Sequence, residues 1–219
     1  PIEIDLAVTR VLLDAGAGPN WHFRDPLTGE NHPRSEGLAL ASLYLFSKGT
    51  FSSDPNDPLK ADAESLRKFG VEQLAKGFQF SAANPLVGLE ERAALLRRLG
   101  EQLLSFLGTD QEPNPRIANI LDKISIGEDR VLKVDRLLGT LQKLLRNVWP
   151  PRLTLGGRNL GDVWRHHLLA DSEITAELVP FHKLTQWLTY SLLEPLEEAG
   201  YQVQDIDLLT GLPEYRTGG

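Results

Sequence analysis

Three consecutive residues near the C-terminus combine an acid, a phenol and a base. They are Glu214, Tyr215 and Arg216, within LTGLPEYRTGG at residues 209–219. This stretch is polar and glycine-rich and follows a hydrophobic run, which is typical of a loop. A carboxylate beside a guanidinium forms an ion pair at a surface, whereas in a cleft the same pair can act as an oriented acid or an electrostatic stabiliser. The sequence leaves both interpretations open.

A second polar group is predicted on one face of a helix. In VPFHKLTQWLTY, a helix that starts near Pro180 places His182, Gln186 and Thr189 at spacing i, i+4 and i+7. Such a stripe is either a solvated surface or the wall of a pocket, where a few polar groups orient a small ligand. The residues assigned to the buried side, and the aromatic residues that flank the stripe, are Phe181, Leu184, Leu188, Leu192, Trp187 and Tyr190.

Standard catalytic and phosphate-binding motifs are absent from the sequence: it has no GxGxxG, Walker loop, HExxH or GxSxG. The glycines of LGGRNLG, residues 155–161, favour a hairpin turn, because the stretch does not open a helix with phosphate-loop spacing. His166 and His167 are adjacent, so a three-histidine metal site with His182 is the weaker alternative to structural histidines. We expect no metal and no cofactor.

The composition narrows the class of protein. The chain has 219 residues, a net charge of −7 and no cysteine. An acidic balance argues against a nucleic-acid partner, and the sequence has no apolar run long enough to span a membrane. We expect a cytoplasmic protein whose oligomeric state the sequence does not determine. The chain contains no methionine and starts at Pro1, from which we expect a longer gene product.

The elements that must position these groups are mostly helical. Apolar periodicity predicts about seven or eight helices, with Ser35 and Asn84 as N-caps and Pro85 in a first turn. The prediction is an all-α fold with one or two small hairpins, built as a single helical domain over 1–219. The predicted helices lie within 2–20, 34–49, 62–80, 84–108, 117–124, 133–151 and 179–200, and the hairpins within 21–35 and 152–166.

Several idiosyncratic stretches, in order along the whole chain, resemble one family. They include DLAVTRVLLDAGAGPNW, GTFSSDPNDPLKAD, RLTLGGRNLGDVWRH and TGLPEYRTGG. The chain resembles the uracil catabolism protein family of fungi and bacteria, long treated as a domain of unknown function. Members are longer at both ends, which implies that this chain corresponds to their middle and C-terminal part. The resemblance implies a role in a pyrimidine-degrading route in which the ring is opened while attached to ribose and urea is released.

The step that the resemblance implies is the consumption of ribosylurea by hydrolysis of its N-glycosidic bond. The tail is also similar to a short signature of the queuosine salvage nucleosidases, which are helical proteins related in shape to DNA glycosylases. This chain departs from that signature because Glu214 stands where those proteins have Asp. The likeness implies a helical, DNA-glycosylase-like fold.

The resemblance and the polar and aromatic clustering together suggest roles for individual residues. Glu214 would supply the carboxylate at the reacting carbon, with Asp205 or Asp207 as a second acid or a ligand of ribose. Cleavage of a ribosyl C–N bond passes through an oxocarbenium-like state, which a carboxylate stabilises without a metal. The residues expected to bind or enclose the substrate are Arg216, His182, Gln186, Trp187, Trp164 and Tyr215.

Two other functions are compatible with an acidic helical chain. One is a non-catalytic partner that binds an intermediate for the ring-opening enzyme of the same route. The other, a DNA glycosylase, is disfavoured by the net charge of −7. The expected partner is therefore a small ribosylated urea or a nucleotide-like molecule, with no nucleic acid and no membrane.

Overall fold

The computed structural model describes residues 1–169 and 175–212. The chain divides into two compact units, Pro1–Lys123 (unit 1) and Ile124–Gly219 (unit 2), which we describe separately. The single domain expected over 1–219 stays a prediction beside this division. Among the described residues, none of the helices combines the length and the apolar character needed to cross a membrane.

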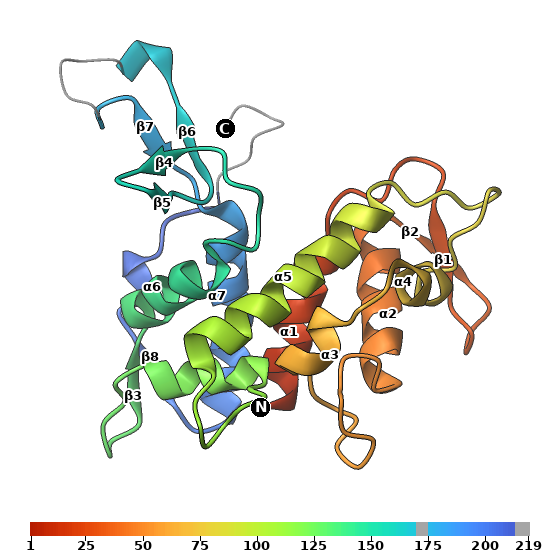
Figure 1. Ribbon diagram of the computed structural model, residues 1–219, viewed down its shortest axis with the longest axis horizontal. Coiled ribbons are helices and arrows are strands. Elements are labelled where there is room, and N and C mark those ends of the chain that lie inside the picture. The colour runs from red at the N-terminus through yellow and green to blue at the C-terminus, as the bar shows by residue number, and fades with distance from the viewer. Residues whose placement is uncertain (170–174, 213–219) are drawn as a thin grey trace. The chain divides into compact units, whose positions relative to one another are not determined.

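Unit 1 is a set of helices with one small hairpin (Figure 1). Its strands β1 (His22–Arg24) and β2 (Asn31–Pro33) pair antiparallel, with Phe23 opposite His32. The DPLTGE turn therefore joins a hairpin, as the sequence predicts. The helices are α1 (Ile2–Leu13), α2 (Arg34–Ser47), α3 (Ala63–Arg67), α4 (Val71–Gly77), α5 (Leu89–Leu107) and the 3-10 helix η1 (Ile117–Lys123).

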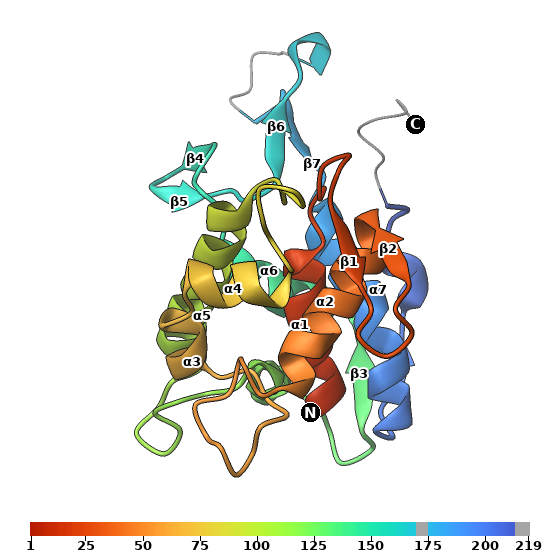
Figure 2. The same cartoon turned by 90° about the vertical axis from the view of Figure 1, so that its right-hand side faces the viewer.

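Helix α5 buries the apolar stripe that its sequence predicts. A glycine in the middle of the helix, Gly100, lets α3 lie directly against it: an added Cβ would lie 2.6 Å from the Arg67 nitrogen and 2.8 Å from the Ala63 oxygen. Both views show α3 alongside α5 (Figures 1 and 2). A side chain at this position would force the two backbones apart. The fully buried stripe residues of α5 are Ala93, Leu96, Leu99 and Leu103.

Two predicted caps in unit 1 are wrong, because tertiary partners use the side chains instead. Helix α2 follows β2 directly and has Pro33 as its N-cap, while Ser35 hydrogen-bonds the carboxylate of Asp14. Helix α5 begins at Leu89, after the predicted Asn84 and Pro85. Asn84 instead binds the hairpin: its Oδ1 accepts from the His22 nitrogen (3.0 Å), and its Nδ2 donates to the His22 oxygen (2.9 Å).

Unit 2 pairs two long helices, α6 (Val134–Leu145) and α7 (Lys183–Glu198), with short strands at both ends of α7. The β6–β7 ladder lies at the start of α7 and the β3–β8 ladder at its other end (Figures 1 and 2). The β3–β8 pair is parallel, whereas β4–β5 and β6–β7 are antiparallel. The short elements are β3 (Val131–Lys133), β4 (Thr154–Leu155), β5 (Arg158–Asn159), β6 (Val163–Arg165), β7 (Leu178–Pro180), β8 (Gln202–Gln204), and the 3-10 helices η2 (His167–Leu169) and η3 (Ile206–Leu208).

The hairpin predicted on Gly156-Gly157 is confirmed as β4–β5. Helix α7 begins three residues later than predicted, at Lys183, because Pro180 closes strand β7 and His182 takes a left-handed conformation. Leucines from the facing sides of α6 and α7 form the core of unit 2. The most deeply buried are Leu137, Leu141, Leu144, Leu188, Leu192 and Leu196.

The fold is mostly helical, as predicted, but it is not purely all-α. The described residues form four two-stranded sheets where one or two hairpins were expected. The parallel β3–β8 pair joins segments about seventy residues apart, and periodicity within a segment carries no information on such a pairing. The relation to DNA glycosylases stays a prediction.

Candidate functional site

One aspartate joins the β6–β7 ladder to the start of α7. The backbone oxygen of Asp162 accepts hydrogen bonds from the Phe181 nitrogen (3.1 Å) and the His182 nitrogen (3.2 Å). Its carboxylate accepts from the Lys183 nitrogen through Oδ2 (3.1 Å) and from the Trp164 indole through Oδ1 (3.0 Å). Asp162 thus satisfies backbone donors that the first turn of a helix leaves without an intrahelical partner.

The hydrogen bonds of Asp162 hold His182 in a strained conformation. His182 has φ 46° and ψ 35°, a left-handed geometry that residues other than glycine rarely adopt. Gly161 lies directly against the ring, since a Cβ added there would lie 3.6 Å from the His182 Cε1. Burial lowers the pKa of His182, and the charge of Asp162 opposes that shift. The imidazole is therefore mostly neutral at neutral pH and can both donate and accept a hydrogen bond.

A partly exposed aromatic residue, Trp164, is bonded to the same aspartate that supports His182. The Trp164 side chain, bonded to Asp162, is 46% exposed. The Arg152 guanidinium lies over its ring, 4.4 Å from the centroid. A partly exposed indole that carries a cation on one face can shape the edge of a binding site. The other predicted wall residue, Trp187, is half-buried on α7.

Two of the three residues of the polar stripe, Gln186 and Thr189, are buried on α7, so for them the interpretation as a solvated surface is wrong. Gln186 is 7% exposed and Thr189 is fully buried. The Gln186 Oε1 accepts from the Thr210 nitrogen (3.2 Å) and hydroxyl (2.7 Å), and its Nε2 donates to the Phe181 oxygen (3.2 Å). One turn further on, the Tyr190 hydroxyl donates to the Thr210 oxygen (3.1 Å). Thr210 is thereby bound to α7 through its backbone and its side chain.

The two acids predicted near the reacting carbon lie on the segment that leads to Thr210. Asp205, at the end of β8, forms an ion pair with Lys133 (3.2 Å), and its side chain is 40% exposed. Asp207 lies in η3 and is exposed. The described contacts of Asp205 are thus at the β3–β8 ladder, whereas those of His182 are with Gly161 and Asp162. The remaining predicted site residues, Glu214, Tyr215 and Arg216, lie outside the described residues.

The structure brings three of the predicted residues to the start of α7, namely His182, Gln186 and Trp164. Asp162, which connects His182 and Trp164, was not among the predicted site residues. The available signal was an Asp that follows a glycine at the entrance of a strand, since Asp side chains accept from nearby backbone nitrogens in turns.

The three-histidine alternative is not formed. The rings of His166 and His167 stack on one another, with centroids 5.3 Å apart, whereas His182 packs against Gly161. Nor do the described residues include any group of three or more His, Cys, Asp or Glu side chains that could hold a metal ion.

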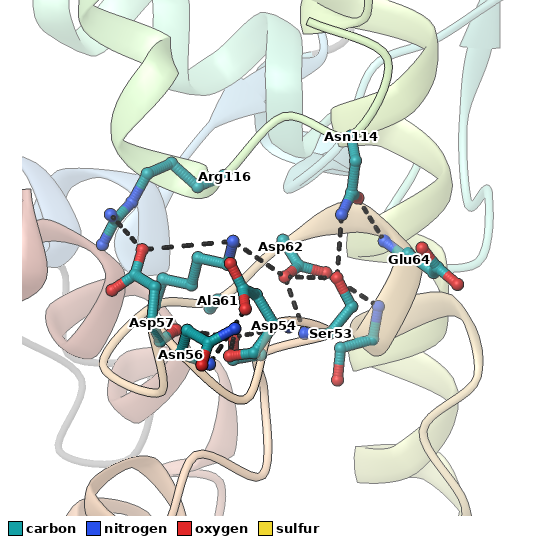
Figure 3. A network of polar contacts seen from close by, with 12 residues as sticks. Ser53, Asp54, Asn56, Asp57, Ala61, Asp62, Glu64, Asn114 and Arg116 are labelled. Carbon is teal, nitrogen blue, oxygen red and sulfur yellow. Dashed lines mark hydrogen bonds and ion pairs between the residues drawn. The ribbon is translucent and has the colours of Figure 1, made fainter.

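Unit 1 contains a polar network of a different kind, centred on two buried aspartates, of which Figure 3 labels Asp62. Asp62 is fully buried, and its Oδ2 accepts from the Ser53 nitrogen (2.8 Å) and hydroxyl (2.9 Å). Its Oδ1 accepts from the Ser65 nitrogen (2.9 Å) and so caps α3. Asn114 extends the network: its Nδ2 donates to the Ser53 hydroxyl, and its Oδ1 accepts from the Glu64 nitrogen.

The second aspartate of this network, Asp5, lies on α1 and is also fully buried. Its carboxylate accepts from the Ala61 nitrogen (2.9 Å), the Ala118 nitrogen (2.8 Å) and the Arg116 Nε (2.9 Å). Burial raises the pKa of Asp5 to about 6, and these donors oppose the shift. The carboxyl is therefore mostly ionised at neutral pH and holds three chain segments together.

Comparison with known proteins places the chain in a family. Residues 2–219 match a family described as a protein of unknown function, DUF1688. The chain belongs to this family. It is 45% identical over 217 residues to "Protein urg3" of Schizosaccharomyces pombe and 38% identical over 228 residues to "Uracil catabolism protein 4" of Lachancea kluyveri. Each match covers 99% of this chain, but only 51% and 52% of the respective relative. The chain thus spans about half the length of the curated relatives it matches, and the predicted membership of the uracil catabolism family is confirmed.

Proposed function

We propose that this protein acts in uracil catabolism and hydrolyses the N-glycosidic bond of ribosylurea or of its phosphate. In this reaction the C–N bond breaks and its electron pair goes to the urea nitrogen, which takes up a proton. The water oxygen bonds to C1 of the ribose and loses a proton. The products are urea and ribose, or ribose phosphate.

The observation that carries the proposal is the 38% identity, over 99% of this chain, to a protein named for uracil catabolism. The chemistry of the start of α7 is compatible with it. A half-buried, mostly neutral imidazole at His182 can hydrogen-bond a ribose hydroxyl or a urea group, and the exposed ring of Trp164 can enclose a small polar ligand.

The proposed carboxylate is Glu214. Thr210 precedes it by four residues, and four residues of extended chain reach at most ~14 Å. A segment that starts at Thr210 is therefore long enough for Glu214 to act beside His182, which precedes Gln186 by one helical turn of about 6 Å. In this arrangement Glu214 stabilises the oxocarbenium-like state, while Arg216 and His182 orient the substrate.

The test is urea release from ribosylurea and from its phosphate by purified full-length protein. We expect turnover by the wild type and at least a ~100-fold lower rate for Glu214→Gln, since a carboxylate that acts at the reacting carbon contributes on this scale. The matched control is Glu194→Gln, the same change at an exposed position of α7, which should keep the wild-type rate.

The possible outcomes separate the parts of the proposal. No urea from the wild type rejects the hydrolase activity. Tight binding of the wild type to the ring-opening enzyme of the route, without turnover, would instead favour the non-catalytic partner. Full activity of Glu214→Gln rejects Glu214 alone and leaves the reaction standing.

A further inference from the structure

Gln186 was expected to bind the substrate, but its amide oxygen and one of its two amide N–H groups already have partners within the protein. Its Oε1 already accepts two hydrogen bonds from Thr210, and its Nε2 donates to the Phe181 oxygen. An amide oxygen has two lone pairs, so both acceptor positions are in use. The side chain is also 7% exposed, which leaves little of it for a ligand to reach.

We propose that Gln186 is a positioning residue that links the backbone before His182 to Thr210, where the C-terminal segment begins. One end of its amide binds Phe181, which directly precedes the strained His182. The other end binds the backbone nitrogen and the hydroxyl of Thr210. A single rigid amide therefore sets the separation between the backbone before His182 and Thr210. The consequence for catalysis rests on the proposed function, whereas the link itself does not.

Tyr190 strengthens the link from the same face of α7. Its hydroxyl donates to the Thr210 oxygen, so the nitrogen, the oxygen and the hydroxyl of Thr210 are all bound by two side chains four residues apart. Thr210 is otherwise an exposed residue after a short 3-10 helix. Its conformation is therefore held by polar contacts with two side chains of α7.

Hydrogen exchange tests the link without any assumption about activity. The Thr210 amide donates to Gln186, so Gln186→Leu should speed its exchange by roughly tenfold or more, the equivalent of one lost hydrogen bond. Gln204→Leu, the same change at an exposed position on β8, is the matched control and should leave the Thr210 exchange rate unchanged. A Thr210 amide that exchanges equally fast in wild type and Gln186→Leu would overturn the proposal.

Kinetics then separates positioning from substrate binding. Thr210→Val removes the hydroxyl donor, and Tyr190→Phe removes the phenol donor. If Gln186 positions the segment, both variants and Gln186→Leu should lower kcat for urea release by about tenfold, with KM changed less than about twofold. The matched controls, Thr154→Val on β4 and Tyr201→Phe after α7, should behave as the wild type.

A double variant supplies the last arm. Gln186→Leu and Thr210→Val break the same contact, so their combination should cost no more than Gln186→Leu alone. A rise in KM confined to Gln186→Leu, with Thr210→Val and Tyr190→Phe unaffected, would show a substrate contact and overturn the positioning role. A wild type that releases no urea would reject the proposed function, and the exchange experiment would still decide the link.

Discussion

Both units bury polar side chains, but they use them differently. In unit 1, Asp5 and Asp62 are fully buried: Asp5 accepts from the backbone of two distant segments, and Asp62 accepts from the backbone nitrogens of Ser53 and Ser65. In unit 2, Gln186 is buried too, but it lies one helical turn after the strained His182, and Asp162, which binds the His182 nitrogen, also binds the partly exposed Trp164. The first arrangement joins loops in a satisfied network. The second maintains an unfavourable backbone conformation beside an exposed ring, which is where functional groups are found.

From this difference between the units, we expect that removing a buried carboxylate of unit 1 chiefly lowers the free energy of unfolding. Asp5→Leu leaves the Ala61 and Ala118 amides without their acceptor and removes the buried partner of the Arg116 guanidinium, which keeps the Leu59 oxygen and Asp57. We expect the free energy of unfolding to fall by about 3–5 kcal/mol. The measurement is chemical denaturation of the variant and the wild type at pH 7.

The control for this prediction removes the outer partner of the same guanidinium. Asp57 lies 3.7 Å from Arg116, and its side chain is 51% exposed. Asp57→Asn should cost less than about 1 kcal/mol. Equal costs for Asp57→Asn and Asp5→Leu would mean that burial does not set the strength of this network.

A single added methyl group tests the scaffold of unit 2. Gly161 has φ 72°, so Gly161→Ala should lower the free energy of unfolding by about 1 kcal/mol through backbone strain. Its Cβ would make only an ordinary contact of 3.6 Å with His182. Gly139→Ala is the matched control: it lies inside α6 with nothing within 4 Å of an added Cβ, and we expect it to stabilise by about 0.5–1 kcal/mol. Thermal denaturation shows whether each variant is less or more stable than the wild type. A change of stability in the same direction for both would contradict the prediction.

The strained histidine should matter for activity more than for folding. Asn tolerates the left-handed conformation, so His182→Asn is expected to change the free energy of unfolding by less than about 1 kcal/mol. The rate of urea release should fall at least ~10-fold, because a group that orients the substrate is lost. Parallel denaturation and rate measurements check both parts. A large loss of stability with full activity would assign His182 to the fold and remove the contrast with Asp5.

The smallest effect concerns the protonation of His182. Burial lowers its pKa below the unfolded value of 6.5, so the unfolded state binds more protons in the window between the two values. His182 therefore contributes stability at neutral pH that is lost as the pH falls below about 6.5. NMR titration should give a midpoint below 6.5 for its imidazole, and Asp162→Asn should lower it further, because the opposing charge is removed. A midpoint that Asp162→Asn raises would contradict this assignment of the charge effect.

The elements of this chain follow from local patterns to a useful extent. The stripe of α5 and the hairpin on Gly156-Gly157 are both present as predicted. The predicted helix boundary was wrong where a polar side chain could either cap a helix or bind a distant segment. Asn84 has the chemistry of an N-cap, but it bonds the β1–β2 hairpin instead, and α5 begins five residues later.

The candidate site was predictable only in part. Residue types and spacing indicated His182 and Gln186, and the resemblance together with the aromatic clustering added Trp164; the structure brings all three to the start of α7. The same spacing did not reveal that the stripe is buried, because the face of a helix that packs inward depends on which segment covers it. Here Thr210 provides the cover for Gln186, from a position twenty-four residues further along the chain.

Local patterns were enough to predict the helical class and the principal helices, because periodicity is a property of a single segment, and the quoted stretches were enough to predict the family. Which polar side chains meet depends instead on how distant segments pack. The Asp162 connection between β6 and α7, the Gln186 link from Phe181 to Thr210, and the Asp5 network all join segments far apart in sequence. Such contacts depend on chain closure and packing, and no pattern within one segment specifies its distant partner.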